Sequence, residues 1–330
     1  MSTSTARRIM RWTGKALLWL VVALVVLAVV GAIYQAIATE RDERAYPPPG
    51  QLVDVGGYRL HLNCVGEGSP TVILEAANLG MSAYWVRVQQ QVAQTTRVCA
   101  YDRAGLGWSE RGPEPRDARK ISSELHTLLK DAGIEGPFVL VGHSYGGLYV
   151  RMYADRYPEE VAGVVLVDAT HPEAFTRSPE ERALYEQTNR WGAVLPFLTR
   201  LGVIRLFNVN PAHPDLPPHQ RAQIEAFNSS TQHVVTTVEE FRATPQTTAQ
   251  VRGAATLGDK PLAVITAGEQ SSGWLEMQDE LAALSANSIH RVVDGATHES
   301  LLYDKGDAQV TSAAIFEVVE VVRKDQPLTR

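Results

Sequence analysis

The most informative stretch of the 330-residue sequence is Phe138-Val139-Leu140-Val141-Gly142-His143-Ser144-Tyr145-Gly146-Gly147. Its four apolar residues predict a strand, and the residues after it predict a helix that ends before Pro158. Between them stands Gly-x-Ser-x-Gly, in the strand, turn and helix context that makes this motif meaningful. So tight a turn requires glycine at positions 142 and 146 and pushes the Ser144 hydroxyl outward. The stretch therefore predicts a nucleophilic serine beside the free N–H groups of a helix start.

Short apolar strands and helical segments alternate on both sides of this stretch. We expect strands at residues 51–55, 58–65, 71–75, 97–101, 138–141, 161–167, 261–266 and 289–293. We expect helices at residues 85–94, 121–132, 147–156, 275–284 and 307–322. Such alternation is typical of the α/β class, and it predicts a doubly wound, mostly parallel sheet of eight strands.

The alternation stops between residues 171 and 256, where prolines and short helical stretches leave no convincing strand. We interpret this segment as an inserted helical cap. The α/β core then comprises residues 51–170 and 257–330, and residues 1–50 precede it. One apolar part of the cap is suited to lining an acyl pocket, although ordinary packing onto the core would also explain it: Trp191, Val194, Leu195, Phe197, Leu198, Leu201, Val203, Ile204, Leu206 and Phe207.

The N-terminal region contains 23 consecutive uncharged residues, from Ala16 to Ala38. A helix of this length spans about 34 Å, enough to cross a bilayer core of about 30 Å. Four basic residues and no acidic residue precede it: Arg7, Arg8, Arg11 and Lys15. By the positive-inside rule, the N-terminus stays in the cytoplasm and the rest of the chain crosses the membrane. We therefore predict a single-pass membrane protein with the lipid bilayer as a partner, a stiff spacer at residues 46–50 and an extracytoplasmic catalytic domain.

Two other interpretations of the apolar run compete with an anchor. A buried core helix is rarely apolar on all sides over six turns. A cleaved signal peptide is the stronger competitor, because Ala36-Ile37-Ala38 matches the small-x-small cleavage pattern. The run is longer than the usual signal core of about 7–15 residues, which favours an uncleaved anchor. A mature protein that begins at Thr39 would exclude the anchor.

The composition excludes several classes of protein. With 31 basic and 37 acidic residues the formal net charge is −6, whereas nucleic-acid-binding proteins usually carry a basic excess. Two cysteines are too few for a disulfide-rich scaffold or a cysteine-based zinc cluster, and the histidines show no metal-binding spacing. We therefore expect no nucleic-acid partner, no metal and no other cofactor.

Three motifs resemble those of the α/β-hydrolase superfamily, and the resemblance extends from about Val53 to Val322. They are the turn at residues 142–146, Tyr101-Asp102-Arg103-Ala104-Gly105-Leu106-Gly107-Trp108-Ser109, and Gly295-Ala296-Thr297-His298. The resemblance implies the α/β-hydrolase fold and assigns His298 as the base that activates Ser144. A serine at this position argues against the epoxide hydrolases and haloalkane dehalogenases of the fold, whose resemblance would require aspartate there.

The acid of the catalytic triad is ambiguous in the sequence. The family usually places an aspartate a few residues after the seventh strand, where this chain has only Glu269. Some members place the acid after the sixth strand, where this chain has Asp168. We favour Asp168 and keep Glu269 as the alternative. An aspartate in this position could also serve as an ordinary turn or cap residue.

The resemblance also implies an oxyanion hole made by the backbone N–H groups of Tyr145 and Asn78. Cys64 and Cys99 fall on strands that are neighbours in this fold, so an extracytoplasmic domain permits a disulfide between them. The predicted function is a membrane-anchored serine hydrolase that cleaves a small-molecule acyl substrate, a carboxylic ester of lipid-like character. Two alternatives stay open: a receptor-like protein of the same fold that binds a ligand without turnover, and a peptidase or acyltransferase that shares the acyl-Ser144 step.

Overall fold

The computed structural model describes residues 3–328, and the side chains from Met10 onward. Eight strands form one sheet in the order β1-β2-β4-β3-β5-β6-β7-β8. Their bounds are β1 Gln51–Asp54, β2 Arg59–Val65, β3 Val72–Glu75, β4 Val98–Tyr101, β5 Phe138–His143, β6 Val161–Val167, β7 Leu262–Ala267 and β8 Ser288–Val293. Strand β2 is antiparallel to β1 and β4, and the other pairs are parallel. The predicted fold class is therefore confirmed.

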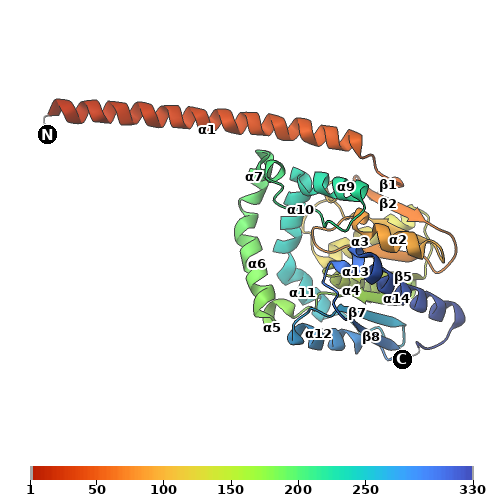
Figure 1. Cartoon of the computed structure of the whole chain (residues 1–330). Coiled ribbons are helices and arrows are strands. Elements are labelled where there is room, and N and C mark those ends of the chain that lie inside the picture. The colour runs from red at the N-terminus through yellow and green to blue at the C-terminus, as the bar shows by residue number, and fades with distance from the viewer. Residues whose placement is uncertain (1–2, 329–330) are drawn as a thin grey trace.

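Helices cover both faces of this sheet, which is why strands β3, β5 and β7 are buried at every position (Figure 1). Val139 and Val141 of β5 pack toward α2 (Val86–Val92) and α14 (Lys305–Lys324). Leu140 points to the other face, toward α3 (Ala118–Asp131), α4 (Gly146–Arg156) and α12 (Ser272–Ala282). The strand period of two thus divides one apolar run between two cores.

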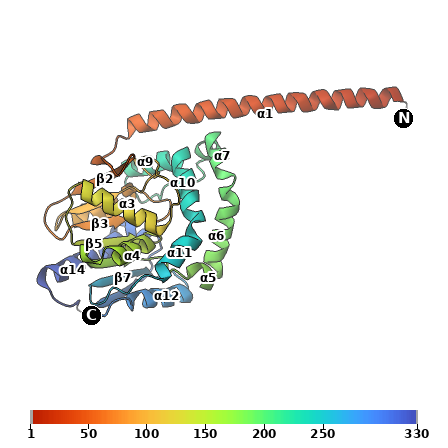
Figure 2. The ribbon, with the colours of Figure 1, turned by 180° about the vertical axis from the view of Figure 1, so that it is seen from behind.

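Seven helices form an insertion between β6 and β7, with no strand among them. They are α5 Ala174–Arg177, α6 Pro179–Gly192, α7 Leu195–Arg200, α8 Val203–Leu206, α9 Pro218–Asn228, α10 Thr231–Arg242 and α11 Thr244–Arg252. The Ser178 and Ser230 side chains accept N–H groups at the starts of α6 and α10, which fixes where those helices begin. We call α5–α11 the helical insertion. In both ribbon views it stands along one side of the domain, with α5 next to α12 (Ser272–Ala282) (Figures 1 and 2).

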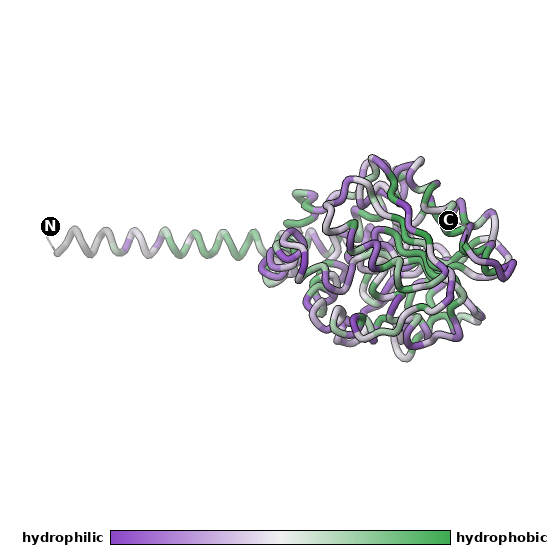
Figure 3. Tube along the Cα trace, turned by 90° about the horizontal axis from the view of Figure 1, so that it is seen from below, coloured by the Kyte–Doolittle hydropathy of each residue, from purple (hydrophilic) through white to green (hydrophobic). Residues whose placement is uncertain are grey.

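Short helical turns complete the chain: a 3-10 turn at Ser82–Trp85, another at Pro158–Glu160, and α13 at Ser300–Tyr303. The remaining element is α1, Thr3–Ala45, which is longer than the uncharged run and projects from the domain (Figure 3). It is long and apolar enough to cross a membrane. The side chains of Arg7 and Arg8, on which the charge argument partly rests, lie outside the described side chains.

The segment after α1 lies on the domain. The Trp108 indole donates to the Tyr46 carbonyl at 2.8 Å, and the His61 ring contacts the Pro49 carbonyl. The spacer of residues 46–50 is therefore held at two points along its length.

The two cysteines are joined in a disulfide, as predicted. Cys64 of β2 lies directly opposite Cys99 of β4 in the antiparallel pairing. The bond therefore links the antiparallel edge of the sheet to its parallel centre.

Candidate active site

The turn between β5 and α4 has the strained shape that the sequence predicts. Ser144 has a left-handed φ of 53°, which a non-glycine residue rarely adopts. A Cβ on Gly142 would lie 2.6 Å from the carbonyl of Gly146, and a side chain on Gly146 would collide with the carbonyl of Glu75. The Ser144 amide donates to the Val167 carbonyl at 3.1 Å. The backbone therefore holds the serine at the point where β5 ends and α4 begins.

A histidine and an aspartate from distant parts of the chain meet beside this turn. Asp168 follows β6 directly and is fully buried, while His298 lies in the loop after β8 and is 30% exposed. The His298 Nδ1 and the Asp168 Oδ2 are 2.6 Å apart. With a proton on Nδ1, the Nε2 of His298 is free to accept a proton from another group.

The pKa shifts of His298 and Asp168 suit a base and its anionic partner. Burial disfavours the positive charge on His298, but the hydrogen bond and negative charge of Asp168 outweigh burial and raise the pKa of His298. Burial also disfavours the charge on Asp168, but its bonds from His298, Trp274 and Gln270 keep the pKa of Asp168 below its ordinary value. Asp168 is therefore a carboxylate at neutral pH.

The other candidate acid, Glu269, is not part of this arrangement. Its side chain is exposed and makes no hydrogen bond or ion pair within the described part of the chain. The residue next to it, Gln270, instead donates to Asp168 at 2.5 Å, and the Trp274 indole donates at 2.9 Å. Sequence reasoning missed both donors because it searched this loop only for a carboxylate.

His143, inside the serine turn, supports the histidine loop. Its ring lies 4.6 Å from the His298 ring, and its Nε2 donates to the His298 carbonyl at 3.0 Å. Burial and the neighbouring charge of His298 lower the pKa of His143, so that it stays neutral. His143 therefore packs beside the His298–Asp168 pair and fixes the His298 loop.

The Ser144 hydroxyl makes no hydrogen bond to any of the residues that the structure describes. The hydrogen bonds of catalytic groups are often long without substrate and tighten in the complex. The structure thus brings His298 and Asp168 together and places Ser144 on the neighbouring turn.

Two backbone N–H groups near Ser144 are free to bind an anion. Neither the Tyr145 nor the Asn78 amide donates a hydrogen bond within residues 3–328. Tyr145 is the first residue after the serine, at the start of α4, and Asn78 lies in the loop after β3. Both amides come from the two segments that the family resemblance names.

Arg103 holds the loop that contains Asn78, a role that sequence reasoning missed. The buried guanidinium donates to the Ala76 and Ala77 carbonyls, each at 2.8 Å. It also bonds Glu75 at 2.7 Å and Glu240 of α10 at 2.9 Å, and thereby ties this loop to the helical insertion. Burial raises the pKa of Glu75 to about 7, although Arg103 opposes that shift. The position of Arg103 within the Tyr101–Ser109 motif was the available signal.

Aromatic rings from the insertion lie against the residue that follows the serine. The Tyr145 ring is 5.7 Å from Phe175 and 5.5 Å from Phe241, and Tyr185 is 5.7 Å from Phe175. We call these four rings the aromatic wall. Much of the predicted acyl-pocket stretch does not line a pocket. Four of its largest side chains are exposed at the surface, whereas Ile204 is buried: Trp191 on α6, Phe197 on α7, Leu206 on α8 and Phe207 after it.

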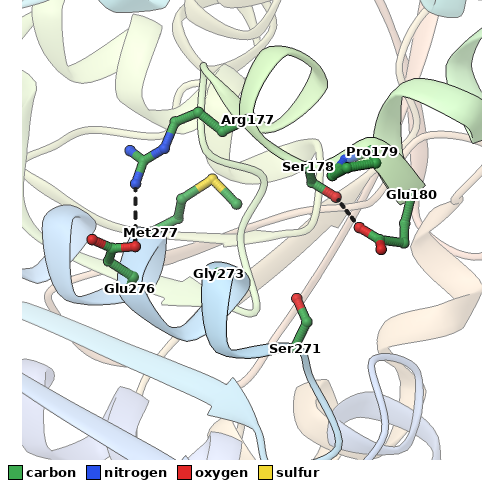
Figure 4. Close-up of a pocket in the computed structure, with 8 residues that line it drawn as sticks. All are labelled: Arg177, Ser178, Pro179, Glu180, Ser271, Gly273, Glu276 and Met277. Atoms are coloured by element: carbon green, nitrogen blue, oxygen red, sulfur yellow. Dashed lines mark hydrogen bonds and ion pairs between the residues drawn. The ribbon is translucent and has the colours of Figure 1, made fainter.

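A hollow of about 300 Å³ opens between α5–α6 and the start of α12 (Figure 4). Its lining is mainly polar: Arg177, Ser178, Pro179, Glu180, Ser271, Gly273, Glu276 and Met277. Next to it on α6, burial raises the pKa of Glu181, which also senses the charges of His298 and Asp168. Ser271 in the lining directly follows Gln270, the residue that donates to Asp168. No group of three or more potential metal ligands gathers within the described residues.

Comparisons with known proteins agree with this geometry. Residues 70–305 match the family model of the alpha/beta hydrolase fold. An uncharacterized protein of Schizosaccharomyces pombe is 26% identical over 302 residues, 79% of this chain and 54% of that protein. An uncharacterized vacuolar membrane protein of Saccharomyces cerevisiae is 29% identical over 145 residues, 38% of this chain and 22% of its own length. The chain thus spans about half or less of these curated relatives.

Solved structures share the fold at low sequence identity. A variant of an epoxide hydrolase from Bacillus megaterium superposes with a TM-score of 0.65 and 16% identity, and the match covers 82% of this chain and all of that one. Likeness at this level concerns the fold alone. Since the family model covers well over half of its residues, the chain belongs to the alpha/beta hydrolase fold family.

Proposed function

We propose that this protein is a membrane-anchored serine hydrolase that cleaves carboxylic esters of lipid-like character. Ser144 would be the nucleophile, His298 the general base and Asp168 the acid that orients it. The observation that carries the proposal is the pairing of a left-handed serine at a helix start with a histidine held by a buried carboxylate. Residues 171–256 would act as the cap over this site.

In the first half of the reaction, the Ser144 Oγ attacks the ester carbonyl and His298 Nε2 takes the hydroxyl proton. Asp168 accepts the Nδ1–H and stabilises the imidazolium. The carbonyl oxygen, now negative, receives hydrogen bonds from the free amides of Tyr145 and Asn78. When the tetrahedral intermediate collapses, the alcohol leaves with the proton from His298, and the acyl group stays on Ser144.

In the second half, water replaces the alcohol. His298 takes a proton from the water as its oxygen attacks the acyl carbonyl, and then returns that proton to Ser144 Oγ as the acid leaves. His298 passes on each proton that it takes, so Ser144 and His298 end the cycle in their starting protonation states. The same acyl-enzyme would form from an amide or pass to another acceptor, so the leaving group must be found by experiment.

Two features favour an apolar acyl group. The aromatic wall places Phe175 and Phe241 of the insertion against Tyr145 and Tyr185 against Phe175, and such rings pack against hydrocarbon. Helix α1 is apolar enough to span a membrane, which would keep the site close to lipid. We infer that the N-terminus is cytoplasmic and the domain extracytoplasmic, which the disulfide also favours. N-terminal sequencing of the mature protein tests the anchor, because a start at Thr39 would contradict it.

A fluorophosphonate probe on the full chain in membranes tests the chemistry. We expect the wild type to be labelled and Ser144→Ala to lose both the label and ester turnover, the latter by about 10⁶-fold. The matched control is Ser82→Ala, because the Ser82 hydroxyl also lies beside a histidine, 3.4 Å from His61. Ser82→Ala should keep the label.

Other outcomes would redirect the proposal. A folded wild type that takes up no Ser144-dependent label would indicate a ligand-binding protein instead of an enzyme. If the label is present, p-nitrophenyl esters and anilides of equal chain length separate an esterase from a peptidase. Faster turnover with longer esters would support a lipid-like substrate, and equal rates at all lengths would contradict it.

A further inference from the structure

Helix α1 does not simply lead away from the domain, because one stripe of it packs against the helical insertion. The stripe recurs at helical spacing and is partly or fully buried: Ala28, Gly31, Gln35, Ala38 and Asp42. Gly31 lies so close to the segment after α7 that a side chain there would collide with the Leu201 carbonyl. Small residues permit such close approach, as they do between membrane helices.

Gln35 adds buried hydrogen bonds to this contact. It is the only strongly polar residue between Ala16 and Ala38, and it is 4% exposed. Its amide donates to the Ser229 carbonyl at 2.8 Å and accepts from Arg205 at 3.3 Å. Arg205 also pairs with Asp42, about two turns further along α1. A buried amide is costly without partners, so these bonds hold the insertion against the end of the apolar run.

The surface next to this contact is apolar. Outside α1, nine large apolar side chains of the described chain are exposed, and six of them lie between residues 191 and 209. We call these six the apolar tip: Trp191, Val194, Phe197, Leu206, Phe207 and Val209. Phe207 is 71% exposed and comes two residues after Arg205, which holds α1. Clusters of this kind mark interaction surfaces.

The ribbon views show where the apolar tip faces. Helix α7 lies directly beside α1, and α6 runs across the side of the domain that is turned toward the N-terminal part of α1 (Figures 1 and 2). The long green stretch of α1 in Figure 3 reaches the domain on that same side. The apolar tip and the apolar run are therefore neighbours.

The position of Gly31 along α1 indicates what surrounds the apolar tip. Gly31 precedes Ala38, the last residue of the uncharged run, by seven residues, which is about 10 Å of helix. With α1 across a bilayer, residues beside Gly31 reach the depth of about 5–10 Å that interfacial apolar faces occupy. Arg190 and Arg200 near the tip are exposed, where they can reach lipid headgroups.

We propose that the apolar tip inserts into the lipid leaflet beside α1, as a second membrane contact that fixes the orientation of the domain. Trp191 belongs to the residue type that gathers at membrane interfaces. The proposal rests on the proposed membrane crossing of α1 and not on the proposed ester cleavage. The domain would then contact the bilayer directly through the apolar tip, in addition to its connection through α1.

The test uses the full chain in phosphatidylcholine vesicles. Because both native cysteines form the disulfide, a new cysteine is the single free thiol for an environment-sensitive fluorescent label. Phe207→Cys labels the tip, and Val292→Cys labels an exposed apolar position on β8 as the matched control. Val25→Cys labels α1 itself. Nitroxide groups on the upper acyl chain of the lipid quench labels in the leaflet, and iodide quenches labels in water.

We expect lipid nitroxides to quench the Phe207→Cys label at least twofold more than the Val292→Cys label, and iodide to show the reverse order. If both labels are quenched equally while the Val25→Cys label lies in lipid, the insertion of the apolar tip is contradicted and the membrane crossing of α1 is retained. A Val25→Cys label outside lipid would overturn the anchor and the tip together. A Phe207→Cys label shielded from both quenchers would place a second copy of the chain on the tip, which also contradicts the proposal.

Discussion

Two clusters of serine, histidine and aspartate occur among the residues that the structure describes, and they differ in the burial of the histidine and in what its second ring nitrogen contacts. In the first, His298 Nδ1 binds Asp168 at 2.6 Å and its ring is partly exposed beside Ser144. In the second, His61 Nδ1 binds Asp102 at 2.9 Å, and both side chains are fully buried. The residue types and the histidine–carboxylate bond are the same.

The difference between the clusters lies at the other ring nitrogen. His61 Nε2 is occupied by the Pro49 carbonyl, and the Ser82 hydroxyl lies on the Nδ1 side of the ring, at 3.4 Å. His298 Nε2 has no partner among the described residues. A histidine whose two nitrogens are both occupied cannot carry a proton to a substrate, so the second cluster joins the spacer to the core. A histidine–aspartate pair is therefore not evidence of catalysis until the second nitrogen is accounted for.

The largest expected effect concerns the acid of the first cluster. Asp168→Asn should lower kcat by about 10⁴-fold with little change in fold, because asparagine cannot hold the imidazolium. Steady-state turnover of a short ester measures it. The control Glu269→Gln, at an exposed position in the neighbouring loop, should keep normal turnover. If Glu269→Gln loses turnover while Asp168→Asn keeps normal turnover, Glu269 is the acid instead of Asp168.

A smaller effect, on stability instead of turnover, is expected in the second cluster. His61→Leu leaves the buried Asp102 carboxylate without its counter-charge, which should cost about 3–5 kcal/mol in the free energy of unfolding. The folded fraction should keep its kcat within a few-fold. Denaturant unfolding measures the loss.

The matched control for His61→Leu is His126→Leu, whose pair with Glu160 is partly exposed and should cost no more than about 1 kcal/mol. If His61→Leu abolishes turnover in a fully folded protein, the second cluster is catalytic after all and the comparison fails.

The smallest effect is a difference in pH dependence. Asp168 raises the pKa of His298 above 6.5, so kcat/KM should rise about tenfold per pH unit below that pKa and then level off. In Asp168→Asn the residual activity should level off at lower pH. Asp102 likewise raises the pKa of His61, against the effect of burial. That contribution to stability is present below pH 6.5 and is lost as the pH rises through the raised pKa.

Activity and the His61 contribution to stability should therefore change in opposite directions over the same pH range. Rate profiles and unfolding curves at matched pH values show both. An unfolding free energy that depends on pH identically in wild type and His61→Leu would contradict the second half of this prediction.

Much of the fold could be predicted from residue patterns alone. The strand period of two and the apolar runs placed all eight strands, and the glycines at 142 and 146 predicted the serine turn, because these features depend only on neighbouring residues. The long apolar helix followed from length and charge in the same way. The roles of Ser144, His298 and Asp168 remain predictions that the geometry supports.

The rest required the tertiary structure, because it depends on residues that are distant in sequence. Nothing near Asp168 in the sequence indicated that Gln270 and Trp274, about a hundred residues later, would donate hydrogen bonds to its carboxylate. Arg103 meets Glu240 across 137 residues, and the six side chains of the apolar tip are exposed although the sequence suggested an acyl pocket for most of them. The sequence by itself determined the strands of the sheet, the serine turn and a helix long and apolar enough to cross a membrane, since local sterics and hydropathy set them. The tertiary structure decided which polar groups are partners, since a buried charge is stabilised by whichever donor the folded chain brings within about 3 Å.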